Sequence, residues 1–198
     1  MIALISLITE NMNLNKLNEL SKQAHEQAVK NGFWEKDYSG EHCLMMVISE
    51  ISEAIEADRK GYRSHKSEFV SWTNRYTWED KPELLHRTFN MHIKGTVEEE
   101  LADAYIRLLD LAGAQDMDIP DDLSEYLDYV KDTLKELENR SFPEFCFDLC
   151  EMITRGCVIE AMCIIQTYCE FKNIDIFWHI EHKMQYNKTR EYKHGKQY

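Results

Sequence analysis

Two pairs of acidic residues stand at helical spacing within apolar segments of this chain. Glu50 and Glu53 lie in ISEISEAIEADRKG, and Glu100 and Asp103 lie in TVEEELADAYIRLLDLAG. Residues three apart on a helix project within about 60° of each other, so each pair shares one face. If the two helices pack side by side, four carboxylates meet, and such a group needs a cation to neutralise it. Carboxylate oxygens are typical ligands of Mg²⁺, which in proteins usually serves phosphate chemistry.

The helix that carries Glu100 and Asp103 is apolar on nearly every side, which predicts that it is buried. Its charged residues form one narrow strip that also includes Arg107 and Asp110. Buried charges need partners, and Arg107 lies one turn after Asp103. An Asp–Arg–Asp network without a metal is therefore the alternative to a metal site. For the first pair, the alternative is an ordinary exposed acidic face.

The basic residues of the chain gather near its C-terminus. They include Lys183, Lys188, Arg190, Lys193 and Lys196. Lys183, Asn187 and Arg190 follow one another along one helix face, and all three side chains suit anionic oxygens. The alternative is a solvated basic tail. A binding role requires the last helix to return beside the acidic pairs.

Charge and composition restrict the class of protein. The chain has a net charge of −13, so a nucleic-acid partner is not expected. Only 7 Gly and 3 Pro occur in 198 residues, and long segments show 3.6-residue periodicity, which predicts an all-α fold. Six cysteines without a CxxC motif indicate reduced thiols in a cytoplasmic protein, with a zinc site as the alternative.

The N-terminal segment MIALISLITE is apolar but too short to span a membrane, and it lacks the basic region of a signal peptide. We therefore expect an N-terminal extension at 1–11, a single domain at 12–198 and no membrane association.

Caps and glycines mark the ends of the expected helices. Residues 62–95 break the helical pattern and are interpreted as an insertion with one short helix. Thr96 and Glu99 are expected to form a capping box at the start of the third long helix. The predicted helices span about 14–31, 41–60, 96–113, 121–139, 141–155, 157–172 and 176–190.

Two aromatic residues near the acidic segments have two possible roles. Trp34 lies in a short polar loop, where it either covers the core or stacks on a flat ligand. His25 lies on the first predicted helix, where a surface position is the simplest interpretation.

Together these motifs resemble the all-α nucleoside triphosphate pyrophosphatase superfamily, and within it the MazG-like proteins. That group includes the dimeric dUTPases and the dCTP pyrophosphatases. Its pattern E-x-x-E, a spacer and E-x-x-D is matched here by Glu50, Glu53, Glu100 and Asp103. The surrounding segments GFW, SEISEAIEADRKG, KGTVEEELADAYIRLLDLAG and KMQYNKTREYKHGKQY are similar as well. The resemblance extends over 12–61, 94–119 and 174–198.

The resemblance implies a MazG-like helical bundle that hydrolyses a (deoxy)nucleoside triphosphate to the monophosphate and pyrophosphate. The four acids would bind Mg²⁺ or, alternatively, Mn²⁺. Either Glu50 or Glu53 would be the general base. A homodimer or homotetramer is expected. The implied nucleotide-binding residues are Lys183 and Arg190 for phosphate, Asn187 beside them, and Trp34 and His25 for the base.

Two features depart from the family pattern. The spacer at 54–99 has 46 residues, about twice the usual length, and a long helical stretch at 121–172 precedes the C-terminal motif. A rival interpretation is a non-catalytic helical module that binds a nucleotide or a protein partner through the aromatic insertion. A di-iron bundle needs two Glu-x-x-His pairs that face the bundle core, whereas Glu83 with His86 lies in the insertion.

Overall fold

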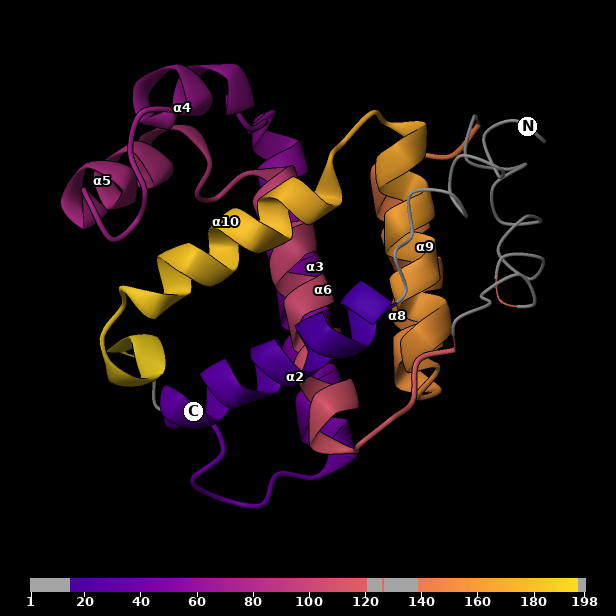
Figure 1. Cartoon of the computed structure of the whole chain (residues 1–198). Helices are drawn as coiled ribbons and strands as arrows, with labels where there is room; N and C mark the ends of the chain where they lie inside the picture. The colour runs from indigo at the N-terminus through magenta and orange to yellow at the C-terminus, as the bar shows by residue number, and fades with distance from the viewer. Residues whose placement is uncertain (1–14, 121–125, 127–138, 196–198) are drawn as a thin grey trace.

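The computed structural model describes residues 15–120, 126 and 139–195, and all regular secondary structure in these ranges is helical (Figure 1). The predicted all-α fold is therefore confirmed. In the described part of the chain, no helix combines the length and the apolar character needed to cross a membrane. The predicted helix at 121–139, with its proposed start at Asp121 or Asp122, and the proposed extension at 1–11 lie outside the described residues.

The centre of the fold is α6 (Val97–Ala114), which is buried along most of its length. It packs against α2 (Asn15–Lys30), α3 (Gly40–Lys60), α9 (Val158–Phe171) and α10 (Ile176–Lys188). In Figure 1, α2 and α10 both cross the α3–α6 pair. A helix surrounded in this way must be apolar on nearly all sides, as the sequence indicates.

A second pair of helices packs against α3 and α6. These are α8 (Phe142–Thr154), which contacts α3, and α9, which packs against both α8 and α6. Their side chains belong to the same large apolar core as those of α3 and α6. The apolar core thus fixes how α3 and α6 are aligned. This alignment determines where the acidic residues lie.

Local capping explains why the predicted helix boundaries agree with the structure. Ser39 accepts a hydrogen bond from the backbone N–H of His42 at the start of α3, and Gly61 ends that helix with φ +69°. Asp175 accepts a hydrogen bond from the backbone N–H of Trp178 at the start of α10. Such signals lie within a few residues of each helix end, so sequence alone can identify them.

The expected capping box at α6 is only half correct. The Thr96 hydroxyl accepts a hydrogen bond from the Glu99 backbone N–H, as predicted. The Glu99 carboxylate, however, accepts from the Gly95 backbone N–H at 2.8 Å instead of that of Thr96. Gly95 adopts φ +74°, a left-handed conformation that turns its N–H toward the helix.

The insertion contains two helices, α4 (Lys66–Thr73) and α5 (Pro82–His92), so the prediction of one short helix was wrong. Apolar residues of both helices, Phe69 and Phe89, pack with Tyr186 of α10 in a second, smaller core. The Phe89 and Tyr186 rings stack with centroids 4.4 Å apart. The insertion therefore covers and fixes α10, an effect that helical periodicity within 62–95 does not reveal.

All six cysteines are free, as predicted from the absence of a CxxC motif. Cys146, Cys163 and Cys169 are buried in the core. Burial raises the pKa of Cys163 to about 12, so this thiol stays protonated at neutral pH. These side chains behave as small apolar groups of the core.

The close approach of α2 to α6 depends on Gly113. A Cβ atom at this position would lie 2.7 Å from the backbone oxygen of Ser21 and 2.8 Å from the Cβ of His25. We expect Gly113→Ala to lower the free energy of unfolding by about 1–3 kcal/mol, because the clash outweighs the higher helix propensity of alanine. Urea titration followed by circular dichroism measures this change.

Gly40→Ala is the matched control, since the nearest atom to a Cβ there, Nε2 of Gln115, is 3.9 Å away. We expect this variant to be as stable as the wild type. Equal stability of the two variants would contradict the close packing of α2 on α6.

Candidate metal and phosphate site

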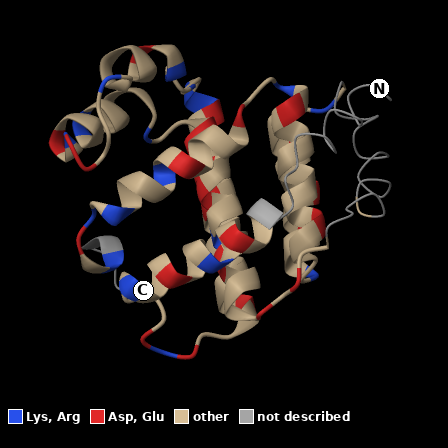
Figure 2. Cartoon of the chain, viewed as in Figure 1, with Lys and Arg blue, Asp and Glu red and all other residues tan. Residues whose placement is uncertain are grey.

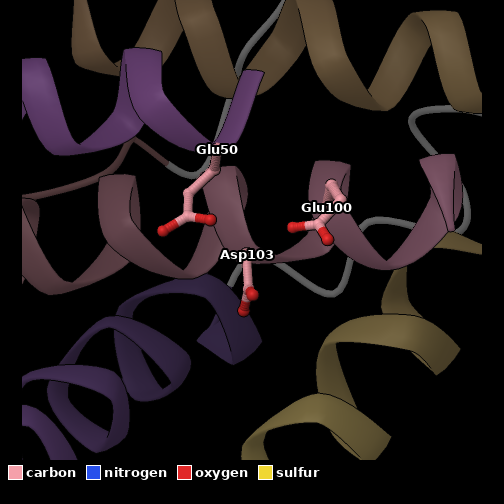
Figure 3. A group of neighbouring side chains, drawn as sticks. All are labelled: Glu50, Glu100 and Asp103. Atoms are coloured by element: carbon pink, nitrogen blue, oxygen red, sulfur yellow. The ribbon is translucent and has the colours of Figure 1, made fainter. Parts of the chain in front are cut away.

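Three carboxylates from two helices meet at the α3–α6 contact. Glu50 projects from α3 toward Glu100 and Asp103 of α6, which lie about one turn apart (Figure 3). One oxygen from each side chain lies within 4.8 Å of the other two. Glu50 is 4% exposed and Glu100 is 8% exposed, so two of the three side chains are shielded from solvent. The structure thus brings together three of the four predicted metal ligands.

Glu53, the fourth predicted ligand, is exposed and is not a member of this group. It lies one turn after Glu50 on α3, and its negative charge contributes to raising the pKa of Glu50 and of Glu100. Glu53 is therefore at the solvent side of the cluster, and its role as ligand or base stays a prediction.

The ion pairs of the site differ from the local pairing expected along α6. Arg107 does not pair with Asp103; its Nε donates to Glu50 Oε1 at 2.6 Å. Asp103 instead lies 2.5 Å from Lys183 Nζ of α10. Because α3 and α10 both lie against α6, these long-range partners replace the neighbour one turn away.

If all were ionised, Glu50, Glu99, Glu100 and Asp103 would carry four negative charges against the two positive charges of Arg107 and Lys183. Burial, together with the charges of Glu99 and Asp103, raises the pKa of Glu100 to about 9. Burial and the Asp103 charge also raise the pKa of Glu50, although Arg107 opposes this shift. Both carboxyl groups resist ionisation because burial and neighbouring negative charges disfavour their charged forms.

The donor set fits a hard divalent cation. All three side chains offer oxygen atoms, which Mg²⁺ and Mn²⁺ prefer over nitrogen or sulfur. Among the described residues, this is the group of three or more His, Cys, Asp or Glu side chains with the spacing for a metal ion. Glu50, Glu100 and Asp103 are thus the residues that could hold such an ion.

The last helix returns beside the acidic cluster, as a phosphate-binding role requires. Lys183 and Asn187 of α10 line one pocket together with Glu50 and Asp103, and Arg190 joins them just beyond the helix end. In Figure 2, basic positions (blue) lie along α10, which crosses the central helices with their acidic positions (red). The pocket therefore combines carboxylates that suit a metal with cations that suit an anion.

Asn187 presents an unused polar atom in this region. Its Oδ1 is buried and has no hydrogen-bond partner in the described part of the chain. A buried polar atom without a partner costs free energy, which a ligand can recover. Asn187 belongs to the set that the sequence singled out, and its position in the pocket agrees with that choice.

Lys183 does not belong to a solvated basic tail, which was the alternative to a binding role. It is 3% exposed, and its Nζ binds both Glu99 and Asp103. These two carboxylates raise the pKa of Lys183 despite its burial, so the side chain stays charged. The lysine is an integral part of the acidic cluster as well as of the pocket wall.

His25 and Trp34 both hold Asp110. Nδ1 of His25 lies 2.9 Å from Asp110 Oδ1, and Nε1 of Trp34 donates to both oxygens of that carboxylate at 3.0 and 3.1 Å. Asp110 lines the pocket that also contains Glu50 and Lys183. It lines a smaller neighbouring pocket as well, together with Trp34 and Tyr38. Trp34 thus has a hydrogen-bonding role that a purely core or purely stacking interpretation omits.

Glu99 is the site residue whose role sequence reasoning missed. The sequence predicts a helix-capping role for Glu99, yet in the structure its side chain is 1% exposed and binds Lys183. The available signal was the run of three glutamates at 98–100 in an otherwise apolar helix, because each of them must find a partner once buried.

Comparison with protein-family models, with curated proteins and with solved structures gives no significant match for this chain.

Proposed function

We propose that this protein hydrolyses a nucleoside triphosphate to the monophosphate and pyrophosphate with the help of Mg²⁺. One observation carries the proposal: Glu50 and Asp103, members of the three-carboxylate group, line the same pocket as Lys183, Asn187 and Arg190. A site that unites carboxylates for a divalent cation with donors for anionic oxygens suits a metal-bound polyphosphate. The resemblance of the sequence motifs to MazG-like enzymes supports the same reaction.

Glu50, Glu100 and Asp103 would hold the metal ion. A bound Mg²⁺ supplies neutralisation of phosphate charge and makes a coordinated water more acidic. Arg107 fixes one oxygen of Glu50, so this carboxylate keeps its orientation toward α6. The buried surroundings of Glu50 and Glu100 exclude competing water from the ligand oxygens.

The remaining residues bind substrate and move a proton. Lys183 and Arg190 approach phosphate oxygens, and Asn187 offers its amide to the phosphate or the sugar. Water attacks the α-phosphorus, the bond to the bridging oxygen of the β-phosphate breaks, and pyrophosphate leaves. Glu53, exposed beside the cluster, accepts the proton of the attacking water in preference to Glu50, whose carboxylate is occupied by Arg107.

The test is pyrophosphate release from a panel of canonical and modified dNTPs and NTPs, with Mg²⁺ or with EDTA. We expect metal-dependent release from at least one member, and the ranking of the panel identifies the base and sugar preference. Bound nucleotide without any pyrophosphate release in Mg²⁺ or Mn²⁺ would overturn the proposal.

One observation favours a second function, that of a helical module for a partner protein. Trp72 of α4 is 64% exposed, and Tyr76 and Val70 beside it are also exposed. Exposed aromatic side chains are typical of protein contacts. The contact would join two copies in the homodimer or homotetramer that we propose, or another protein. Sedimentation of the wild type and of Trp72→Ser measures the oligomeric state and distinguishes the two partners. Loss of self-association in the variant indicates a contact between copies of this chain.

A further inference from the structure

Lys183 lies between two carboxylates that have different surroundings. Its Nζ is 2.5 Å from Asp103 Oδ2 and also binds Glu99 Oε1. Asp103 belongs to the group of three carboxylates that could hold a metal ion, whereas Glu99 does not. The lysine therefore joins the candidate metal site to a carboxylate that lies outside it.

Glu99 is held in place at both of its oxygens. Oε2 accepts a hydrogen bond from the Gly95 backbone N–H at 2.8 Å, and Oε1 binds Lys183. The side chain lies on the first turn of α6 and is almost fully buried. A carboxylate fixed in this way cannot turn toward the metal position, but it can keep Lys183 charged and in place.

The charges of the cluster show what Glu99 adds. Glu50, Glu100 and Asp103 face two cations, Arg107 on Glu50 and Lys183 on Asp103. Without Glu99, Asp103 would be the one carboxylate partner left to Lys183 among the described residues, and the two would form a simple ion pair. A divalent cation and Lys183 would then compete for Asp103, because one carboxylate would serve both.

We propose that Glu99 is a positioning residue of this site, which holds Lys183 as its counter-ion and so leaves Asp103 available to a divalent cation. The inference rests on the metal site of the proposed function, and it adds a residue that acts through Lys183. In the cation-bound state Glu99 keeps the lysine at the pocket wall, where its remaining donors face the anionic part of a ligand.

The test is direct binding of Mn²⁺, measured by calorimetry without nucleotide, to the wild type and to Glu99→Gln. The glutamine can still accept the Gly95 N–H but no longer neutralises Lys183. We expect its Mn²⁺ affinity to be about tenfold lower, in the range typical when a group that supports a metal ligand is lost.

Glu98→Gln is the matched control. Glu98 is the preceding residue, is also buried, and also accepts a backbone N–H, that of Ser64 at 2.9 Å. Among the described contacts it makes none with Lys183. We expect wild-type affinity for Mn²⁺ in this variant, so a drop confined to Glu99→Gln isolates the lysine contact.

The double variant Glu99→Gln with Lys183→Met separates positioning from a merely structural role. Removal of the competing lysine should restore Mn²⁺ affinity to at least the wild-type value. Affinity as low as in Glu99→Gln, or no loss in Glu99→Gln itself, would overturn the inference while leaving the metal site intact. Absence of Mn²⁺ binding to the wild type would overturn both the inference and the metal-dependent function.

Circular dichroism shows whether each variant is folded. If Glu99→Gln does not fold, Glu99→Asp replaces it, since the shorter side chain keeps its charge but withdraws it from Lys183. The same loss of Mn²⁺ affinity is then expected, and unchanged affinity would again contradict the positioning role.

Discussion

Glu50→Gln and Asp103→Asn should each reduce metal-dependent pyrophosphate release by at least about a hundredfold, the upper end of what loss of a supporting group alone produces. Each substitution removes one charged oxygen ligand from a group whose donor atoms lie within 4.8 Å of one another. An amide is a much weaker ligand of Mg²⁺ than a carboxylate, so both ion affinity and charge neutralisation fall. The measurement is the initial rate of pyrophosphate release at saturating Mg²⁺.

Glu56→Gln is the control for this prediction. Glu56 lies on the same helix, but it is exposed and pairs with Arg59 and Lys60 at the surface. Its replacement should leave the rate unchanged, and all three variants should keep the helical circular dichroism of the wild type. Near-normal rates in both Glu50→Gln and Asp103→Asn would eliminate the site assignment.

Glu100→Gln should stabilise the metal-free protein at alkaline pH. The pKa of Glu100 is raised to about 9 from an ordinary value of 4.5, so the folded state keeps a proton that the unfolded chain releases. Stability from this group is greatest below about pH 4.5 and is lost as the pH rises toward about 9, by up to about 1.4 kcal/mol per pH unit. The raised pKa values of Glu50 and Glu99 act in the same direction.

Urea unfolding in EDTA at about pH 6 and about pH 8.5 measures this effect. The wild type should lose stability over this interval, and Glu100→Gln should lose less of it. Added Mg²⁺ should stabilise the wild type at the higher pH, because the ion binds the folded state, and should stabilise the variant less. Parallel pH profiles for wild type and variant would contradict a raised pKa of Glu100 in the folded protein.

The first prediction is a loss of activity when a carboxylate is replaced, whereas the second is a gain of stability. Glu50 and Glu100 are acidic residues in a setting that opposes their ionisation, and core residues of α6 such as Leu101 and Leu108 must hold them there. Functional sites commonly keep groups that lower stability in this way. The apolar core that α3 and α6 share stabilises the fold against this cost.

The helices could be predicted because their signals are local. Periodicity, the Thr96 and Asp175 caps and the glycine at 61 each act within one or two turns of the chain. The acidic pairs were visible for a similar reason, since charges that interrupt an apolar helix can be identified from the order of residues alone. The insertion was less predictable, because α4 and α5 depend on packing against α10.

The sequence by itself determined the helical class, the identity of the acidic residues and the presence of suitable basic and amide side chains near the end of the chain. The tertiary structure alone decided which charges meet. Arg107 binds Glu50 instead of Asp103, Lys183 binds Glu99 and Asp103, and Glu53 stays in solvent. Local spacing fixes which residues share a helix face, but ion pairs between helices depend on how α3 and α10 pack against α6, and that packing is set by the apolar core.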